Sequence, residues 1–242
     1  MEFSEYLSHV QRDGDRLLAV ASGDLAPSVP CCPGWTVRDV VEHLAQVFEH
    51  KIACTELNYE PDPWPPLWPE SQEPLVWLED AQSRLLNLLR SRGPDAPSAT
   101  WWPDDQTVGF WGRRMAHETV VHRVDVELAA DHPSPVDPAL ALDGIDEVLQ
   151  LFLAGDWSEA PLDRCEGERI AVSAGDRHWE VTLLPTSIEV EEGTKSVQAE
   201  LSGDSASVML WLWGRTGDAQ VERSGDGVAL SLLRHRLKLA TQ

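Results

Sequence analysis

The sequence predicts an α plus α+β protein, in which a four-helix bundle in residues 1–135 precedes a small α+β domain with an antiparallel sheet in residues 136–242. Four early segments, each of about 20 residues, carry apolar side chains at the helical period, and proline-rich loops separate them. Beyond the prolines of DHPSPVDP the period changes, and short alternating or β-branched runs follow. A chain of 242 residues is long enough to bury two cores.

Each bundle helix is expected where an apolar stripe repeats at the helical period. The first helix covers residues 2–22. The second follows Thr36, which is paired with Asp39 three residues later as in a helix cap. The third covers residues 73–92, and the fourth covers residues 113–131, with the sequence RRMAHETVVHRVDVELAAD. Helices joined by loops in this way are typical of a bundle.

The second domain is expected to combine helices and short strands. Its strands are predicted from alternating runs bounded by Gly, Asp, Pro and Thr. In chain order, its elements are a helix over residues 139–154, strands over residues 169–174, 179–184, 187–190 and 197–201, and helices over residues 206–213 and 228–239. Strands and helices that are segregated along the chain predict an α+β domain.

Charge and hydropathy exclude several classes of function. The chain has 19 basic and 41 acidic residues, a formal net charge of −22. Such a surface repels the phosphate backbone of nucleic acids and anionic lipid, so neither partner is expected. No apolar run reaches the roughly 20 residues needed to span a bilayer. The N-terminus, MEFSEYLSHVQRDGD, lacks the basic start and apolar run of a signal peptide, and we therefore expect a cytoplasmic protein.

The four cysteines, Cys31, Cys32, Cys54 and Cys165, fit neither C-x-x-C spacing nor a disulfide framework. They are typical of reduced thiols in an intracellular protein. Nothing in their spacing indicates a catalytic cysteine.

Glu118 and His122 stand four residues apart in the fourth helix, so their side chains lie on one face. A carboxylate and an imidazole in this arrangement can ligate one divalent metal ion, although the same pair is common on solvated helices. His43 borders the apolar stripe of the second helix, as Glu118 does in the fourth. Bundles build metal sites from side chains on facing helices. The pattern therefore permits a metal site without proving contact.

Four segments resemble the mycothiol-dependent maleylpyruvate isomerase family: CPGWTVRDVVEHLA, HETVVHRVDVELA, LALDGIDEVL and WLWGR. The resemblance covers most of the chain and implies a DinB-like metal-binding bundle followed by a sterol-carrier-like α+β domain. It implies that His43, Glu118 and His122 hold zinc or a similar divalent ion, with a position open to water or thiol. Arg215 in WLWGR matches an arginine that the second domain of the family can lend to the cleft. The implied cosubstrate is mycothiol, a low-molecular-weight thiol.

Several neighbours of these residues have more than one interpretation. His117 is expected to be structural, because HETVVH is one residue too long for the H-E-x-x-H motif of zinc proteases. His50 is interpreted as a surface histidine, with a ligand or supporting role as the alternative. Asp125 either orients a ligand or forms a salt bridge on the helix surface. Tryptophans in the two long loops form the mouth of a pocket for a bulky substrate or cover the end of the bundle: Trp64, Trp68, Trp101 and Trp102.

The sequence thus favours an enzyme that uses a divalent metal ion and mycothiol to act on a small electrophilic substrate, as a transferase or isomerase. The alternative is a non-enzymatic small-molecule-binding protein whose metal is structural or absent. Metal-assisted hydrolysis is a weaker hypothesis, because no general base is identifiable once Glu118 serves as a ligand. Nothing in the sequence predicts an oligomeric state.

Overall fold

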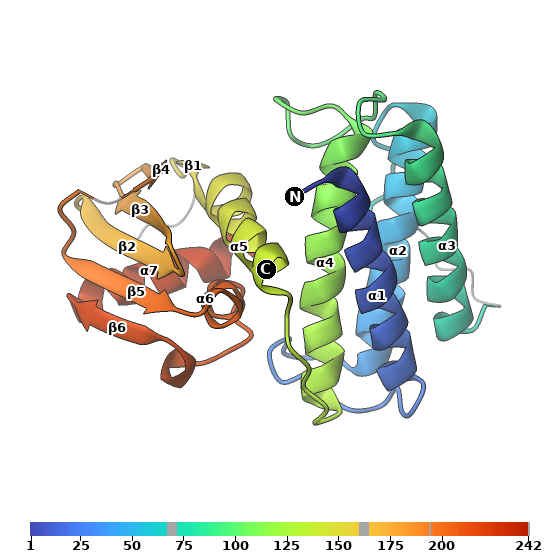
Figure 1. Cartoon of the computed structure of the whole chain (residues 1–242), viewed down its shortest axis with the longest axis horizontal. Helices are drawn as coiled ribbons and strands as arrows, with labels where there is room; N and C mark the ends of the chain where they lie inside the picture. Colours follow the sequence, from blue (N-terminus) through green and yellow to red (C-terminus); the bar gives the residue numbers. More distant parts are fainter. Residues whose placement is uncertain (67–71, 160–164, 194, 242) are drawn as a thin grey trace. The chain divides into compact units, whose positions relative to one another are not determined.

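The structure is a computed structural model that describes residues 1–66, 72–159, 165–193 and 195–241 (Figure 1). The chain divides into two compact units, Met1–Ser134 and Pro135–Gln242. Unit 1 is helical, and unit 2 contains a sheet with further helices, so the predicted fold class is confirmed. Among the described residues, no helix is long and apolar enough to cross a membrane.

Unit 1 is a bundle of four helices that lie side by side (Figure 1). In chain order they are α1 (Phe3–Ala21), α2 (Val37–Leu57), α3 (Pro74–Arg92) and α4 (Val108–Ala129). Each corresponds to a predicted helix, although α4 begins before residue 113, its expected start. The reason is Thr107, whose hydroxyl accepts a hydrogen bond from the amide of Phe110 and caps the helix there.

The N-terminus of α2 is capped by Thr36 and Asp39, as predicted. The Asp39 carboxylate accepts hydrogen bonds from the amide (2.7 Å) and hydroxyl (2.6 Å) of Thr36. In return, the Asp39 amide donates to the Thr36 hydroxyl at 3.4 Å. These bonds satisfy donors that the first turn of a helix leaves unpaired. The cap fixes where α2 begins and therefore the level at which His43 projects from it.

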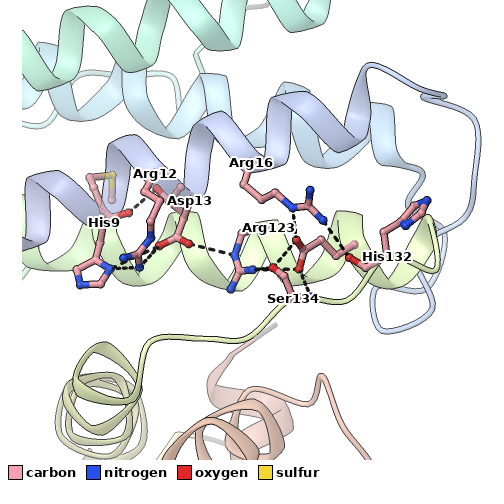
Figure 2. Close-up of polar contacts among 10 residues, drawn as sticks. His9, Arg12, Asp13, Arg16, Arg123, His132 and Ser134 are labelled. Atoms are coloured by element: carbon pink, nitrogen blue, oxygen red, sulfur yellow. Dashed lines mark hydrogen bonds and ion pairs between the residues drawn. The ribbon is translucent and has the colours of Figure 1, made fainter.

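Helix α4 is buried along nearly its whole length, because α1 and α2 both pack against it. Arg123, only 2% exposed, forms ion pairs with Asp13 of α1 (Nε to Oδ1, 3.2 Å) and with Glu127 (Nη1 to Oε2, 3.0 Å). Glu127 also accepts hydrogen bonds from Arg16 and Ser134 (Figure 2). This network ties α1 and the segment after α4 to one buried carboxylate.

Unit 2 begins with α5 (Pro138–Glu147), which continues as a π-helix, η1 (Val148–Leu153). Its six-stranded sheet has the spatial order β1-β4-β3-β2-β5-β6. In chain order the strands are β1 (Gly155–Asp156), β2 (Glu168–Ala174), β3 (Arg177–Leu183), β4 (Ser187–Glu192), β5 (Ala199–Gly203) and β6 (Glu222–Gly225). The other helices are α6 (Ser205–Leu212), a short 3₁₀ turn, η2 (Asp218–Gln220), and α7 (Gly227–Ala240). Both α6 and α7 pack against β2 and β5, and the sheet buries its apolar side chains there.

The sheet is mixed, where the sequence predicted an antiparallel one. Strands β2, β3 and β4 form an antiparallel meander, and β5 then joins the other side of β2 in parallel, with Ile170 opposite Ala199. The two edge strands were not predicted. β1 has two residues, too few to show alternation, and β6 has the exposed polar sequence ERSG. Hydrophobic patterning detects only strands that bury a face.

Candidate metal centre

His43, Glu118 and His122 converge between α2 and α4. His43 projects from α2, and the other two project from one face of α4 because they are four residues apart. Oε1 of Glu118 lies 3.2 Å from Nε2 of His43 and 3.3 Å from Nε2 of His122. One potential ligand atom from each residue lies within 4.8 Å of the others. The structure thus brings together the three residues that the family resemblance singled out.

The donor set of this triad fits a divalent ion such as zinc. Two imidazole nitrogens and a carboxylate oxygen are typical of catalytic zinc sites, which keep a further position for water or substrate. The side chain of His43 is 27% exposed and that of Glu118 is 15% exposed, whereas His122 is buried. Solvent therefore reaches the triad on the side formed by His43 and Glu118.

Glu118 is held in its ionised form. Burial acts to raise its pKa, but the Arg114 guanidinium and hydrogen bonds from His122 and His43 hold that pKa well below the usual value. Arg114 lies one turn earlier on α4, is 6% exposed, and pairs with Oε2 of Glu118. The arginine thus neutralises one carboxylate oxygen, while the other, Oε1, faces both histidines.

Asp125 orients the ring of His122. Its Oδ2 lies 2.9 Å from Nδ1 of the histidine, and its carboxylate is fully buried. Burial acts to lower the pKa of His122, but hydrogen bonds with Asp125 and Glu118 raise that pKa to about 9. A proton held on Nδ1 by a carboxylate leaves Nε2 as the ligating nitrogen. Of the two interpretations of Asp125, the surface salt bridge is wrong, because the residue is buried against His122.

The loop before α2 supplies contacts that sequence reasoning missed. The Cys31 thiol donates a hydrogen bond to Oδ1 of Asp125 at 3.0 Å, and the Cys32 thiol donates to Oδ2 at 3.7 Å. The indole of Trp35 stacks on His122, with 6.4 Å between ring centroids. The available signal was the segment CPGWT, which stands directly before the helix that carries the first histidine.

His50 is buried, and its prediction as a surface histidine is wrong. It is 5% exposed, and its Nδ1 lies 3.0 Å from Nζ of Lys51. The Lys51 ammonium lies over the rings of Trp64 and Trp111, at 4.9 and 4.6 Å from their centroids. Burial lowers the pKa of both His50 and Lys51. His50 therefore belongs to a buried cluster further along α2 and not to the triad of His43.

The other histidine and tryptophans that the sequence singled out are described one by one. His117 is fully buried and meets the ring of Tyr6 edge-on at 6.3 Å, which fits the structural role expected for it. Trp101 and Trp102 contact each other edge-on at 6.0 Å in the loop before α4. Trp68 lies outside the described residues.

Arg215 lies in unit 2, in the turn that follows α6. Its amide donates to the carbonyl of Leu210 at 2.7 Å and so closes the C-terminus of the helix. Its Nη1 donates to the carbonyl of Trp213 at 2.7 Å. The contribution of Arg215 to a substrate site stays a prediction.

Two family models together match most of the chain. The model described as the mycothiol maleylpyruvate isomerase N-terminal domain matches residues 7–127, and the model described as the MDMPI C-terminal domain matches residues 139–232. The chain belongs to the mycothiol maleylpyruvate isomerase family. The family predicted from the sequence motifs is thereby confirmed.

Solved structures of maleylpyruvate isomerase share the fold of this family member. A crystal structure of the mycothiol-dependent maleylpyruvate isomerase is 15% identical, and the match covers 93% of this chain and 95% of that chain with a TM-score of 0.59. A histidine-to-alanine mutant of that isomerase matches with the same identity and coverage and a TM-score of 0.58. The structure named UbiJ-SCP2 ubiquinone synthesis protein is 19% identical over 45% of this chain and 96% of its own, but its TM-score of 0.31 is too low to bear on the sterol-carrier-like prediction. Curated proteins give no match.

Proposed function

We propose that the protein is an enzyme that requires a divalent metal ion and uses mycothiol to act on a small electrophilic substrate, as a transferase or isomerase. The observation that carries this proposal is the convergence of His43, Glu118 and His122 within 4.8 Å. The family and the printed name of the matched isomerase structures support the choice of thiol.

His43, Glu118 and His122 would hold the ion, and zinc is the metal that their donor atoms favour. When bound, such an ion lowers the pKa of a thiol or water at its open position. Arg114 keeps Glu118 ionised, so this ligand loses no proton when the ion enters. Asp125 holds the ring of His122 through Nδ1 and thereby directs Nε2 toward Glu118.

The sulfur of the thiol would attack an electrophilic carbon of the substrate. If the adduct is released, the product is an S-conjugate. If the thiol leaves again after rotation about the former double bond, the product is the cis–trans isomer. Arg215 would hold an anionic group of the substrate or thiol. Among the described residues none selects maleylpyruvate itself, so we favour transfer of the thiol to a broader class of electrophiles.

Removal of the metal ion is expected to abolish the thiol-dependent reaction. Purified protein would be assayed for metal content and for mycothiol-dependent conjugation of a generic electrophile, before and after treatment with a chelator. Adding zinc back to the stripped protein should restore the rate, because Arg114 and Asp125 hold Glu118 and His122 in place through contacts that do not involve the ion. A binding protein would instead copurify with a ligand and show no thiol dependence. Full activity in stripped protein would refute the proposal.

The apparent affinity of the triad for its ion is expected to rise with pH up to about 9, the pKa of His122. Below this pKa the histidine is protonated, so the incoming ion must displace a proton from Nε2. Each unit by which the pH rises toward 9 therefore lowers the apparent dissociation constant about tenfold, and the gain ends above that pH. Glu118 adds no dependence in this range, because its pKa is lowered. Competition with a chelating dye between pH about 7 and 9 measures the slope, and a flat profile would contradict the prediction.

A further inference from the structure

A second group of potential metal ligands lies beside the triad. Cys31 and Cys32, in the loop before α2, approach the carboxylate of Asp125 on α4. One ligand atom from each of the three residues lies within 4.8 Å of the others. The two thiols come from adjacent residues, and 93 and 94 residues separate them from Asp125 in the chain. This grouping is therefore a product of the fold.

We propose that Cys31, Cys32 and Asp125 form a second metal site, which takes a thiophilic divalent ion such as zinc or cadmium. Two sulfur donors select ions that bind thiolate strongly over magnesium or calcium, which prefer oxygen. Three protein donors leave a fourth position for water or an external thiol, as in zinc sites with an open position. The proposal concerns residues outside the triad and stands whether or not the proposed enzymatic function is correct.

Charge balance favours this site. In the ion-free protein the two thiols donate hydrogen bonds to a fully buried carboxylate. A divalent ion that replaces both thiol protons leaves the formal charge of the group unchanged, because two positive charges leave with the protons and two arrive with the ion. The cost of burying additional charge is therefore avoided. The ion would occupy the space between donors that already point at one another.

The sulfur atoms of the proposed site can be reached from solvent. Cys31 and Cys32 are each partly exposed, so an ion can approach the sulfur atoms while Asp125 closes the site from the inside. The other two cysteines, Cys54 and Cys165, are both buried. Among the described residues, neither belongs to a group of three converging metal ligands. The proposal is thus specific to the adjacent pair.

Asp125 can serve both sites through different oxygens. Its Oδ1 lies 3.0 Å from the sulfur of Cys31, and its Oδ2 lies 2.9 Å from Nδ1 of His122. An ion on Oδ1 leaves in place the hydrogen bond that Nδ1 of His122 donates to Oδ2. The structure therefore allows the sulfur-rich site to fill without removing the group that orients His122.

Cobalt(II) distinguishes this site from the triad, because sulfur ligands give a charge-transfer band in the near ultraviolet and nitrogen and oxygen ligands do not. Reduced, metal-free protein would be titrated with cobalt chloride under argon. We expect wild type to develop the band, and Cys31→Ser/Cys32→Ser to lose it together with one equivalent of bound cobalt. Serine preserves the hydrogen bond to Asp125, and thermal unfolding would verify that this variant is folded.

Two further variants make the experiment specific. Cys54→Ala removes a buried thiol outside the proposed site and should keep the full band. His43→Ala removes a ligand of the triad and should also keep the band while it loses the other equivalent of cobalt. Cobalt binding without a sulfur band in wild type, or a band that persists in the double serine variant, would overturn the proposal. A normal sulfur band together with a triad that binds no ion would overturn only the proposed function.

Discussion

Replacing His122 with alanine is expected to eliminate tight binding of the divalent ion at the triad and to lower the thiol-dependent rate more than about 100-fold. This loss of rate is larger than the roughly 10- to 100-fold loss of metal affinity or activity that follows removal of a group that only supports a metal ligand, because His122→Ala removes the ligand itself. It also leaves the buried carboxylate of Asp125 without its imidazole partner. Metal content at equilibrium and the rate of conjugation measure the two effects separately.

Two further variants provide reference values for the loss of metal affinity expected in His122→Ala. Asp125→Asn keeps the ligand but removes the carboxylate that orients it, so metal affinity should fall about 10- to 100-fold. His117→Gln changes a buried histidine on the same helix that is not part of the triad, and it should retain the metal if it folds. His122→Ala protein that keeps both its metal and its full rate would show that the triad is not the active centre.

The helices of unit 1 were predictable because each buries one side against its neighbours, and such burial leaves apolar residues at a regular spacing. The pairing of Glu118 with His122 was also predictable, since helical geometry alone places residues four apart on one face. The proximity of these two residues to His43 could not be predicted in this way. It depends on how α2 and α4 pack, and only the resemblance to a family, not periodicity, indicated it.

The contacts of Cys31 and Cys32 were beyond sequence reasoning for the same physical reason. Their partner, Asp125, lies more than ninety residues away, and no local rule of spacing relates a loop to a distant helix. The burial of His50 was missed because a polar residue beside an apolar stripe looks exposed until neighbouring helices cover it. A sequence pattern indicates whether a side chain prefers water or the core, whereas the packing of the bundle decides which surroundings it has.

The buried charges of α4 show most clearly that sequence patterns do not predict which polar residues are buried. Arg123 and Glu127 follow the spacing of an ordinary solvated ion pair, four residues apart. In the structure both are almost completely buried, at 2% and 1% exposure, and Asp13 approaches from α1 (Figure 2). Sequence assigns such residues to the solvent side of a helix, because isolated charges are costly to bury. Here each charge has a partner of opposite sign, which makes their burial possible.

Arg123→Met is therefore expected to reduce the free energy of unfolding of unit 1 by about 3–5 kcal/mol, the cost of breaking a buried ion pair by removing one partner. Methionine fills similar space, so the loss would come from leaving Asp13 and Glu127 buried without the guanidinium that they share. Urea denaturation measures the change.

Arg38→Met is the matched control for this network. Arg38 also pairs with a glutamate four residues later, Glu42, but its side chain is 50% exposed. Water compensates the partner of an exposed pair, so the loss should stay below about 1 kcal/mol. Adding Asp13→Asn to Arg123→Met should recover part of the stability, because one of the two buried carboxylates that lost the guanidinium then carries no charge. Equal losses for Arg123→Met and Arg38→Met would mean that burial does not strengthen the ion pairs of Arg123.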